Sequence, residues 1–268
     1  MAHKIYDNFF LSNEVEDQYN SHLDLMQFCT IDNTLVGTAG MKRVINVYSA
    51  TNGTQKLAKG EGNTQSIEVS YIDKEYEILL AQNRFVYKDE EEMTDPNLVP
   101  VGMKHAGTDM FNTVNADIFA EYKKATLSTT PAKFDFDAFV DAQAELGLEN
   151  LEDVVKFGFV HPKDMAEVRK NLKESLQYME KFAYSGYVGT VGGVHLYTKK
   201  DATEGEIIIA TKDAVTLFNK LGVEVEQITK DKRSETAANI RENTIFSRKY
   251  YLAALTDATK AVKMIKTV

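Results

Sequence analysis

The sequence predicts an α+β protein in which one long helix and a sheet use both early and late segments of the chain. Apolar residues recur every three to four positions between 100 and 126, the spacing of a helix with one buried face. Two β-rich stretches flank a polar, glycine-containing segment between 41 and 88. Helix-like and strand-like stretches then alternate from 135 to 243, as in a compact α/β domain.

The composition is that of an ordinary globular protein, with room for one large domain or two smaller ones. The 268 residues are 43% hydrophobic and carry a formal net charge of -9. This acidity argues against a tight binder of bare nucleic acid, although a container could enclose nucleic acid without gripping it. The single cysteine, Cys29, excludes an internal disulfide and a multi-cysteine metal site. We expect neither a signal peptide nor a membrane span.

Residues 1–40 are predicted to form an arm. The stretch holds one lysine against six acidic residues and has little apolar mass. A short amphipathic helix fits residues 14–28, and the remainder suits extended chain. Such a stretch is unlikely to fold alone, so we expect it to lie against its own body or a neighbouring chain.

Residues 41–88 predict a long β-hairpin with a protruding loop. The stretch 41–49 is rich in β-branched residues, and 66–87 returns with alternating apolar positions. Between them, Leu57 is almost the only large apolar residue. A long polar hairpin with nothing to bury suggests contact with another subunit.

The acidic run 89–95 and the stretch 100–126 predict a turn followed by the longest helix. Acidic side chains suit the first turn of a helix, and a carboxylate metal site is the sharper but less supported alternative. The methionines at 103 and 110 fit core positions of the helix. We therefore expect Met110 and Ile118 to be buried.

The remaining elements are predicted from the spacing of apolar residues and from the glycines and turn residues that end each element. Helices are expected at 134–147, 161–175 and 212–222, where Gly147 and Gly222 close the first and the last. Strands are expected at 154–160, 190–198, 206–211 and 223–229. The last 25 residues suit two strands joined around Asp257.

Motifs for catalysis, metal binding or nucleotide binding are not recognisable in the sequence. The glycines at 186, 189, 192 and 193 lack the G-x-G-x-x-G spacing and precede a strand, not a helix. The five histidines show no paired spacing, and His161 before Pro162 suits a turn that starts a helix. Cys29 lies in an acidic stretch that would not lower a thiol pKa. We therefore assign no catalytic residue, no cofactor-binding residue and no metal ligand.

The order of these patterns resembles the major capsid (coat) proteins of tailed bacteriophages, which have the HK97-like fold. The resemblance covers nearly the whole chain and is one of order more than of a sharp motif. Its phrases are LAKGEGNTQSIEVSYIDKEYEI, QNRFVYKDEEEM, VNADIFAEYKKA, FGFVHPKDMAEVRK, SGYVGTVGGVHLYT, ATKDAVTLFNKLGVEVEQITKDKR and ENTIFSRKYYLAALTDATKAVKMI.

The resemblance implies a subunit of four parts. These are an N-terminal arm (1–40), an extended loop (41–88), a peripheral domain with a long spine helix (89–131 and 241–268) and an axial α/β domain (132–240). In this family the extended loop reaches across a neighbouring subunit. The contact residues implied in the loop are Lys56, Leu57, Lys59 and Glu61.

The implied function is structural. Such subunits assemble as pentamers and hexamers into an icosahedral shell that encloses double-stranded DNA, with a portal and a scaffolding protein as further partners. Assembly would take place in the cytoplasm of the bacterial host, and the protein would reside in the virion capsid. Enzymatic activity, cofactors, sequence-specific DNA binding and membrane contact are not implied.

Three alternatives remain open at this point. An encapsulin-like nanocompartment shell has the same fold and a similar length but holds an enzyme cargo. An α/β enzyme that uses the central domain would need a pocket with convergent polar groups. Some relatives also join subunits by a Lys–Asn isopeptide bond, for which Lys56 and Lys59 are the candidates, although a solvated lysine is the more common case.

Overall fold

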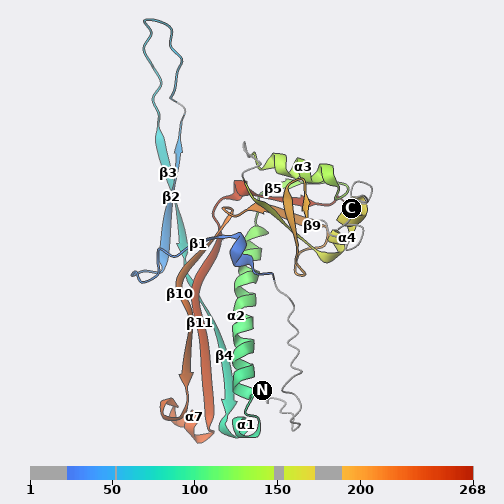
Figure 1. The fold of residues 1–268 in the computed structure, drawn as a ribbon. Coiled ribbons are helices and arrows are strands. Elements are labelled where there is room, and N and C mark those ends of the chain that lie inside the picture. The colour runs from blue at the N-terminus through green and yellow to red at the C-terminus, as the bar shows by residue number, and fades with distance from the viewer. Residues whose placement is uncertain (1–22, 52, 148–153, 173–188, 268) are drawn as a thin grey trace.

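The computed structural model describes residues 23–51, 53–147, 154–172 and 189–267. The molecule is long and narrow, with a hairpin projecting at one end, a compact α/β unit beside its middle, and a helix-backed sheet reaching the other end (Figure 1). None of the helices in these ranges is long and apolar enough to cross a membrane.

A four-stranded sheet forms the elongated part. Its order is β1 (Thr30–Asp32), β10 (Val215–Ile228), β11 (Glu242–Leu255) and β4 (Leu79–Lys88). β10 with β11 and β11 with β4 are antiparallel, whereas β1 runs parallel to β10 and pairs only with residues 216–218. The long helix α2 (Leu98–Tyr122) lies along one face of this sheet (Figure 1). Short elements at the far end are α1 (Asp89–Thr94), η2 (Lys230–Lys232) and α7 (Glu235–Asn239).

A six-stranded sheet forms the compact unit. Its order is β5 (Leu127–Thr129), β12 (Ala261–Ile265), β9 (Glu206–Thr211), β6 (Lys156–Val160), β8 (Val194–Thr198) and β7 (Thr190–Val191). Helices α3 (Phe136–Glu145) and α4 (Pro162–Asn171) pack beside it, and η3 (Ala258–Lys260) leads into β12. Asp135 caps α3 by accepting a hydrogen bond from the Ala138 amide at 3.0 Å. His161 caps α4 by accepting from the Lys163 amide at 3.3 Å, so the predicted role of His161 at a helix start is confirmed.

The projecting hairpin consists of β2 (Lys42–Ala50) and β3 (Val69–Glu77), paired antiparallel from Lys42 with Glu77 to Ala50 with Val69. The predicted hairpin is confirmed, but it is shorter than the range 41–88. β4 leaves it at Leu79 and pairs with β11 instead, because Ile78 is buried in the body and turns the chain into the four-stranded sheet.

The main core lies where α2 meets both sheets. Met110, Val114, Ile118 and Tyr122 are buried along one face of α2, which confirms the helical spacing seen in the sequence. Phe157 and Phe159 from β6 complete an aromatic cluster with Tyr122, with ring centroids 5.4–5.8 Å apart. A second core fills the space between the six-stranded sheet and helices α3 and α4.

The helix predicted at 212–222 is wrong, because residues 212–214 form a turn and residues 215–222 belong to the long strand β10. Val215, Leu217 and Phe218 are buried between neighbouring strands, and β10 pairs with β11 from Val215 onward. The apolar spacing in KDAVTLFNKLG fits a helix and a strand equally well, and Gly222 lies within the strand instead of ending a helix. Pairing with a distant strand decides the outcome.

Two smaller predictions also change. Residues 190–198 form two short strands rather than one, because Gly192 and Gly193 adopt φ values of +56° and +83° and turn the chain. At the end of the helix predicted for 14–28, Leu25–Phe28 form a 3₁₀ turn, η1, capped by Asp24. The first part of that range, the end of the helix predicted for 161–175 and Gly186 lie outside the described residues.

Sheet membership crosses the domain limits predicted from the sequence. β10 lies within 132–240 but belongs to the four-stranded sheet, and β5 and β12 lie in the ranges 89–131 and 241–268 but belong to the six-stranded sheet. The chain therefore passes back and forth between the two units. The naming of these units as peripheral and axial domains stays a prediction.

Candidate assembly surfaces

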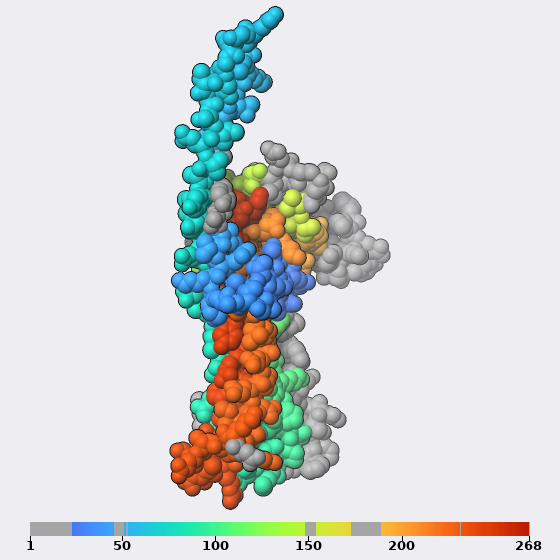
Figure 2. Space-filling model, turned by 90° about the vertical axis from the view of Figure 1, so that its left-hand side faces the viewer, coloured from blue at the N-terminus to red at the C-terminus, as the bar shows by residue number. Residues whose placement is uncertain are grey.

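The hairpin β2–β3 projects without any element packed along its outer length (Figure 2). Its returning strand is exposed at almost every position, and Ile67, Val69, Tyr71 and Ile72 each expose between 60% and 70% of their surface. Because side chains alternate across a strand, Val69 and Ile72 point to opposite faces. Both faces of the returning strand thus carry exposed apolar side chains.

The four residues predicted to contact a neighbour lie together at the end of this hairpin. Lys56, Leu57, Lys59 and Glu61 are all exposed, and Leu57 exposes 42% of its surface. Glu61 folds back, so that its carboxylate accepts a hydrogen bond from the Ala58 amide at 3.2 Å and its amide donates to the Ala58 carbonyl at 3.1 Å. The tip is therefore a small turn that presents Leu57 between two lysines. Whether it contacts a second subunit stays a prediction.

The foot of the hairpin is held by the body. The Tyr76 ring stacks on Phe218 of β10 with centroids 5.0 Å apart, and Ile78 is 2% exposed in the same cluster. The Ile78 amide donates to the Met41 carbonyl at 2.8 Å. Arg43 of β2 lies 3.6 Å from the Asp32 carboxylate of β1. The returning strand of the hairpin is thus exposed over most of its length, whereas the base of the hairpin is fixed to the body.

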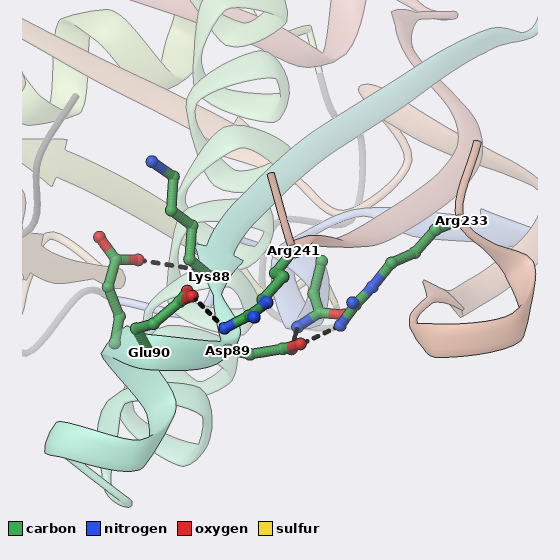
Figure 3. A network of polar contacts seen from close by, with 7 residues as sticks. Lys88, Asp89, Glu90, Arg233 and Arg241 are labelled. Atoms are coloured by element: carbon green, nitrogen blue, oxygen red, sulfur yellow. Dashed lines mark hydrogen bonds and ion pairs between the residues drawn. The ribbon is translucent and has the colours of Figure 1, made fainter. Parts of the chain in front are cut away.

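The opposite end of the molecule carries a network of polar contacts between α1 and the segment 230–243 (Figure 3). The Asp89 carboxylate accepts a very short hydrogen bond from Arg233 and another from the Asn243 amide group at 2.7 Å. Arg233 also donates to the Asn243 side-chain oxygen from Nε at 3.0 Å. Arg241 donates to Glu90 at 2.9 Å. Two charged pairs therefore tie α1 to the segment that precedes β11, and Asn243 adds a contact from β11 itself.

This network explains most of the acidic run that the sequence left ambiguous. Hydrogen bonds from Arg233 and Asn243 hold the pKa of the Asp89 carboxyl below its usual range. Glu91 accepts from the Lys88 amide at 3.0 Å and so caps α1. Within the described ranges, no group of three or more His, Cys, Asp or Glu side chains could hold a metal ion. The run starts helix α1, as the less specific of the two interpretations had it, and it also supplies the ion-pair partners of Arg233 and Arg241, which that interpretation did not include.

Within the predicted arm (1–40), the segment from Leu25 to Asp32 is docked on the body. Leu25 and Cys29 are fully buried, and the Phe28 ring lies 4.9 Å from Phe157. The buried Asn115 of α2 accepts from the Leu25 amide at 3.0 Å, and the Tyr122 hydroxyl donates to the Phe28 carbonyl at 2.6 Å. Burial raises the pKa of the Cys29 thiol to about 11, so this thiol is not a ready nucleophile.

Neither the distal network nor the docking of the arm could be predicted from the sequence. Asp89 and Arg233 are 144 residues apart, and Leu25 and Asn115 are 90 apart, so no local spacing connects them. Only the excess of Lys and Arg at 230–241, opposite the acidic run 89–95, could have suggested an ion-pair partner.

This chain is similar in sequence to one curated protein, although no known family model matches it. It is 25% identical over 266 residues to the major capsid protein of Staphylococcus phage phiMR11, a match that spans 96% of this chain and 92% of the relative.

Solved structures share the fold at much lower identity. The structure from Gordonia phage Cozz superposes with a TM-score of 0.70 at 10% identity, covering 100% of this chain and 92% of that one. The capsid of cyanophage P-SCSP1u gives 0.68 at 12% identity, covering 92% and 89%. A virus-like particle from Pyrococcus furiosus gives 0.56 at 12% identity, covering 92% and 94%.

Together the long helix backing a sheet, the compact α/β unit and the projecting hairpin define an HK97-like capsid fold. The predicted fold family is confirmed. Among proteins of this fold, the chain resembles the major capsid proteins of bacteriophages over nearly its whole length.

Proposed function

We propose that this protein is the major capsid subunit of a bacteriophage, which self-assembles as pentamers and hexamers into an icosahedral shell around double-stranded DNA. One observation carries the proposal. The hairpin β2–β3 exposes apolar side chains on both faces and has no core of its own, so it needs a surface outside the subunit.

The energetics of the hairpin support this interpretation. An isolated two-stranded hairpin is marginally stable in water, because it buries too little apolar surface to offset the ordering of its backbone. Covering Ile72 or Val69 on a neighbour would recover roughly 1–2 kcal/mol for each side chain. A ring or shell of identical subunits supplies such a cover to every hairpin at once.

Within the proposed shell, Lys56, Leu57, Lys59 and Glu61 contact the adjacent subunit. Leu57 is the apolar anchor, and the lysines meet acidic groups on a chain that has 40 acidic and 31 basic residues. The proposed parts are the arm (1–40), the extended loop (41–88), the peripheral domain (89–131 and 241–268) and the axial domain (132–240).

The net charge of -9 suits a shell that encloses DNA without adsorbing it. Sequence-specific DNA contacts are not required, and a portal and a separate scaffolding protein are the further partners. Assembly would take place in the cytoplasm of the bacterial host, with the virion as the final location. The curated relative is a phage protein, so the nanocompartment alternative is not favoured, and a capsid role is structural rather than enzymatic.

The first experiment is expression of the full chain, with sedimentation velocity and negative-stain images of the fast fraction. We expect closed shells or ring-shaped pentamers and hexamers. A small closed dimer at every concentration would contradict the proposal. In particles from phage-infected cells, nuclease-resistant double-stranded DNA would support a capsid, whereas an enclosed enzyme would support a nanocompartment.

The loop contact is tested by four substitutions at once. Lys56→Ser, Leu57→Ser, Lys59→Ser and Glu61→Ser should leave a folded subunit, with unchanged circular dichroism, that no longer closes into shells. The matched control is Thr54→Ser with Gln65→Ser, which alters exposed residues of the same loop outside the contact set. Equal shell yields from both variants would contradict the assigned contact.

A further inference from the structure

The chain enters the hairpin through a short loop, residues 33–40, that we call the foot loop. It is a compact turn in which the Val36 amide donates to the Asn33 carbonyl at 3.0 Å and the Thr38 amide donates to the Leu35 carbonyl at 3.3 Å. The loop lies beside β10, where that strand is irregular. The pairing of β10 with β11 shifts register between Asn219 and Leu221, and again between Leu221 and Glu224.

Lys220 sits at this irregularity and reaches the foot loop. Its ammonium group donates to the Leu35 carbonyl at 3.0 Å and makes a second, very short hydrogen bond to the Thr38 carbonyl. The neighbouring Asn219 donates from its amide group to the Asn33 side-chain oxygen at 3.1 Å. Two consecutive residues of β10 thus hold three residues of the foot loop. The bonds from Lys220 are charge-assisted, and its side chain is half-buried.

On its other side the hairpin continues through Ile78 directly into β4, and its side chains there make mainly apolar contacts. Tyr76 stacks on Phe218, and Ile78 packs in the same cluster with Ala254. A single strand connection and apolar contacts leave some rotation open, whereas hydrogen bonds to two carbonyl oxygens are directional. The polar contacts of the foot loop are therefore suited to restrict the remaining rotation of the hairpin.

We propose that Lys220 is a positioning residue that sets the direction in which the hairpin projects from the body. The length of the hairpin makes this direction sensitive to its foot. A chain extended from Lys42 to Lys59 at ~3.3 Å per residue spans roughly 55 Å. A rotation of roughly 10° at the foot then displaces the tip by roughly 10 Å. Such a displacement exceeds the reach of any side-chain contact at the tip.

This inference rests on the proposed function only for its consequence, since a misdirected hairpin would miss the neighbouring subunit. The direction itself is a property of the single subunit and can be measured there. Failure of the proposed function would therefore leave the test of Lys220 intact.

The test measures the distance from hairpin to body by double electron–electron resonance on the full chain. Spin labels are attached at Gln65→Cys on the hairpin loop and Asp141→Cys on α3, both exposed positions. Cys29 is buried, so the chain without added cysteines should take up no label. We expect one narrow distance distribution, which Lys220→Met should broaden or shift by roughly 7 Å for a rotation of roughly 10°, because Gln65 lies opposite Thr54, roughly 40 Å from the foot.

Two variants separate positioning from general damage. Lys220→Arg keeps a cationic donor and should restore the narrow distribution. Lys212→Met removes an exposed lysine on the turn that precedes β10 and should leave the distribution unchanged. A narrow, wild-type distribution in folded Lys220→Met would overturn the proposal. The same broadening in Lys212→Met would also overturn it.

A second variant covers the case in which Lys220→Met fails to fold. Gly37 has φ +73° with open space around its Cα, so Gly37→Ala strains the foot loop without a clash and displaces the carbonyls that Lys220 binds. We expect a broadened distribution with a small change in thermal stability. An unchanged distribution in Gly37→Ala would show that the foot loop does not set the direction.

Discussion

Two long antiparallel ribbons project from opposite ends of this molecule, and they differ in what covers them. The distal ribbon of β10, β11 and β4 has helix α2 along one face, and there Asn243, Ile245, Ser247 and Tyr251 are all nearly inaccessible to solvent. No described helix covers the outer part of the hairpin β2–β3, where Val69 and Ile72 expose 64% and 70% of their surface. The same secondary structure is thus covered on one face by a helix of its own chain in the distal ribbon, although Val223 and Val225 of β10 stay exposed, and is uncovered on both faces in the hairpin.

The largest expected effect comes from charging one residue in each region. Ile118 is fully buried on α2, so Ile118→Asp should cost more than about 4 kcal/mol and abolish folding. Ile72→Asp on the hairpin should leave the subunit folded and reduce only assembly. Circular dichroism with urea titration measures the first effect, and sedimentation of the assembled fraction the second. A urea midpoint of Ile118→Asp equal to that of the unsubstituted chain would contradict the difference between the two regions.

A smaller loss in the free energy of unfolding is expected from a substitution where the arm docks on α2. Tyr122→Phe removes the hydroxyl that donates to the Phe28 carbonyl at 2.6 Å and leaves that buried carbonyl without this donor. The free energy of unfolding should decrease by about 1–3 kcal/mol. The shift of the urea midpoint measures it, and Tyr76→Phe, which keeps the ring stacked on Phe218, is the control. Equal midpoints for Tyr122→Phe and Tyr76→Phe would show that docking of the arm does not stabilise the body.

The distal network should contribute stability that depends on pH. The pKa of Asp89 is lowered in the folded state, because Arg233 and Asn243 donate to its carboxylate. This contribution is therefore complete above the unfolded pKa, near 4, and is lost as the pH falls through the lower folded value. Arg233→Met should cost about 1–2 kcal/mol at pH 7 and less in acid.

Urea midpoints at pH 7 and pH 3 provide the measurement for Arg233. The control is Arg84→Met, since Arg84 on β4 pairs with Glu242 at 3.3 Å but its side chain is 55% exposed. Surface pairs of this kind contribute little, so its effect should be smaller. A cost for Arg233→Met that does not decrease in acid would contradict the role given to Asp89.

The smallest effect concerns thiol reactivity and leaves stability unchanged. Cys29 is fully buried with a pKa of about 11, so it should react with a thiol reagent only after unfolding. A cysteine introduced as Gln65→Cys on the hairpin loop should react at the rate of a free thiol. Rapid labelling of Cys29 in the native protein would mean that the docked arm opens readily.

The parts of the fold that could be predicted are those decided locally. The spacing of Met110, Val114 and Ile118 specifies a helix, and a loop with little besides Leu57 to bury specifies a protruding hairpin. The stretch 212–222 was predicted wrongly because its apolar pattern fits both a helix and a strand, and the partner that decides between them lies some thirty residues further along the chain.

The candidate surfaces divide in the same way. The four residues proposed as contacts at the hairpin tip follow from loop composition together with resemblance to a family. The pair of Asp89 with Arg233 and the reach of Lys220 to the foot loop depend on side chains that meet only after the strands have paired. A single sequence does not show which distant residues lie close together in the fold, so these contacts could not be predicted from it.

The direct continuation of β3 into β4 at Ile78 has a mechanical consequence. A pull on the hairpin, such as internal pressure would exert in the proposed shell, is transmitted along the axis of β4. The ten paired positions between β4 and β11, from Leu79 with Tyr251 to Lys88 with Glu242, then bear the load together in shear instead of parting one after another. The exposed hairpin is thus joined to the body through an attachment that resists force.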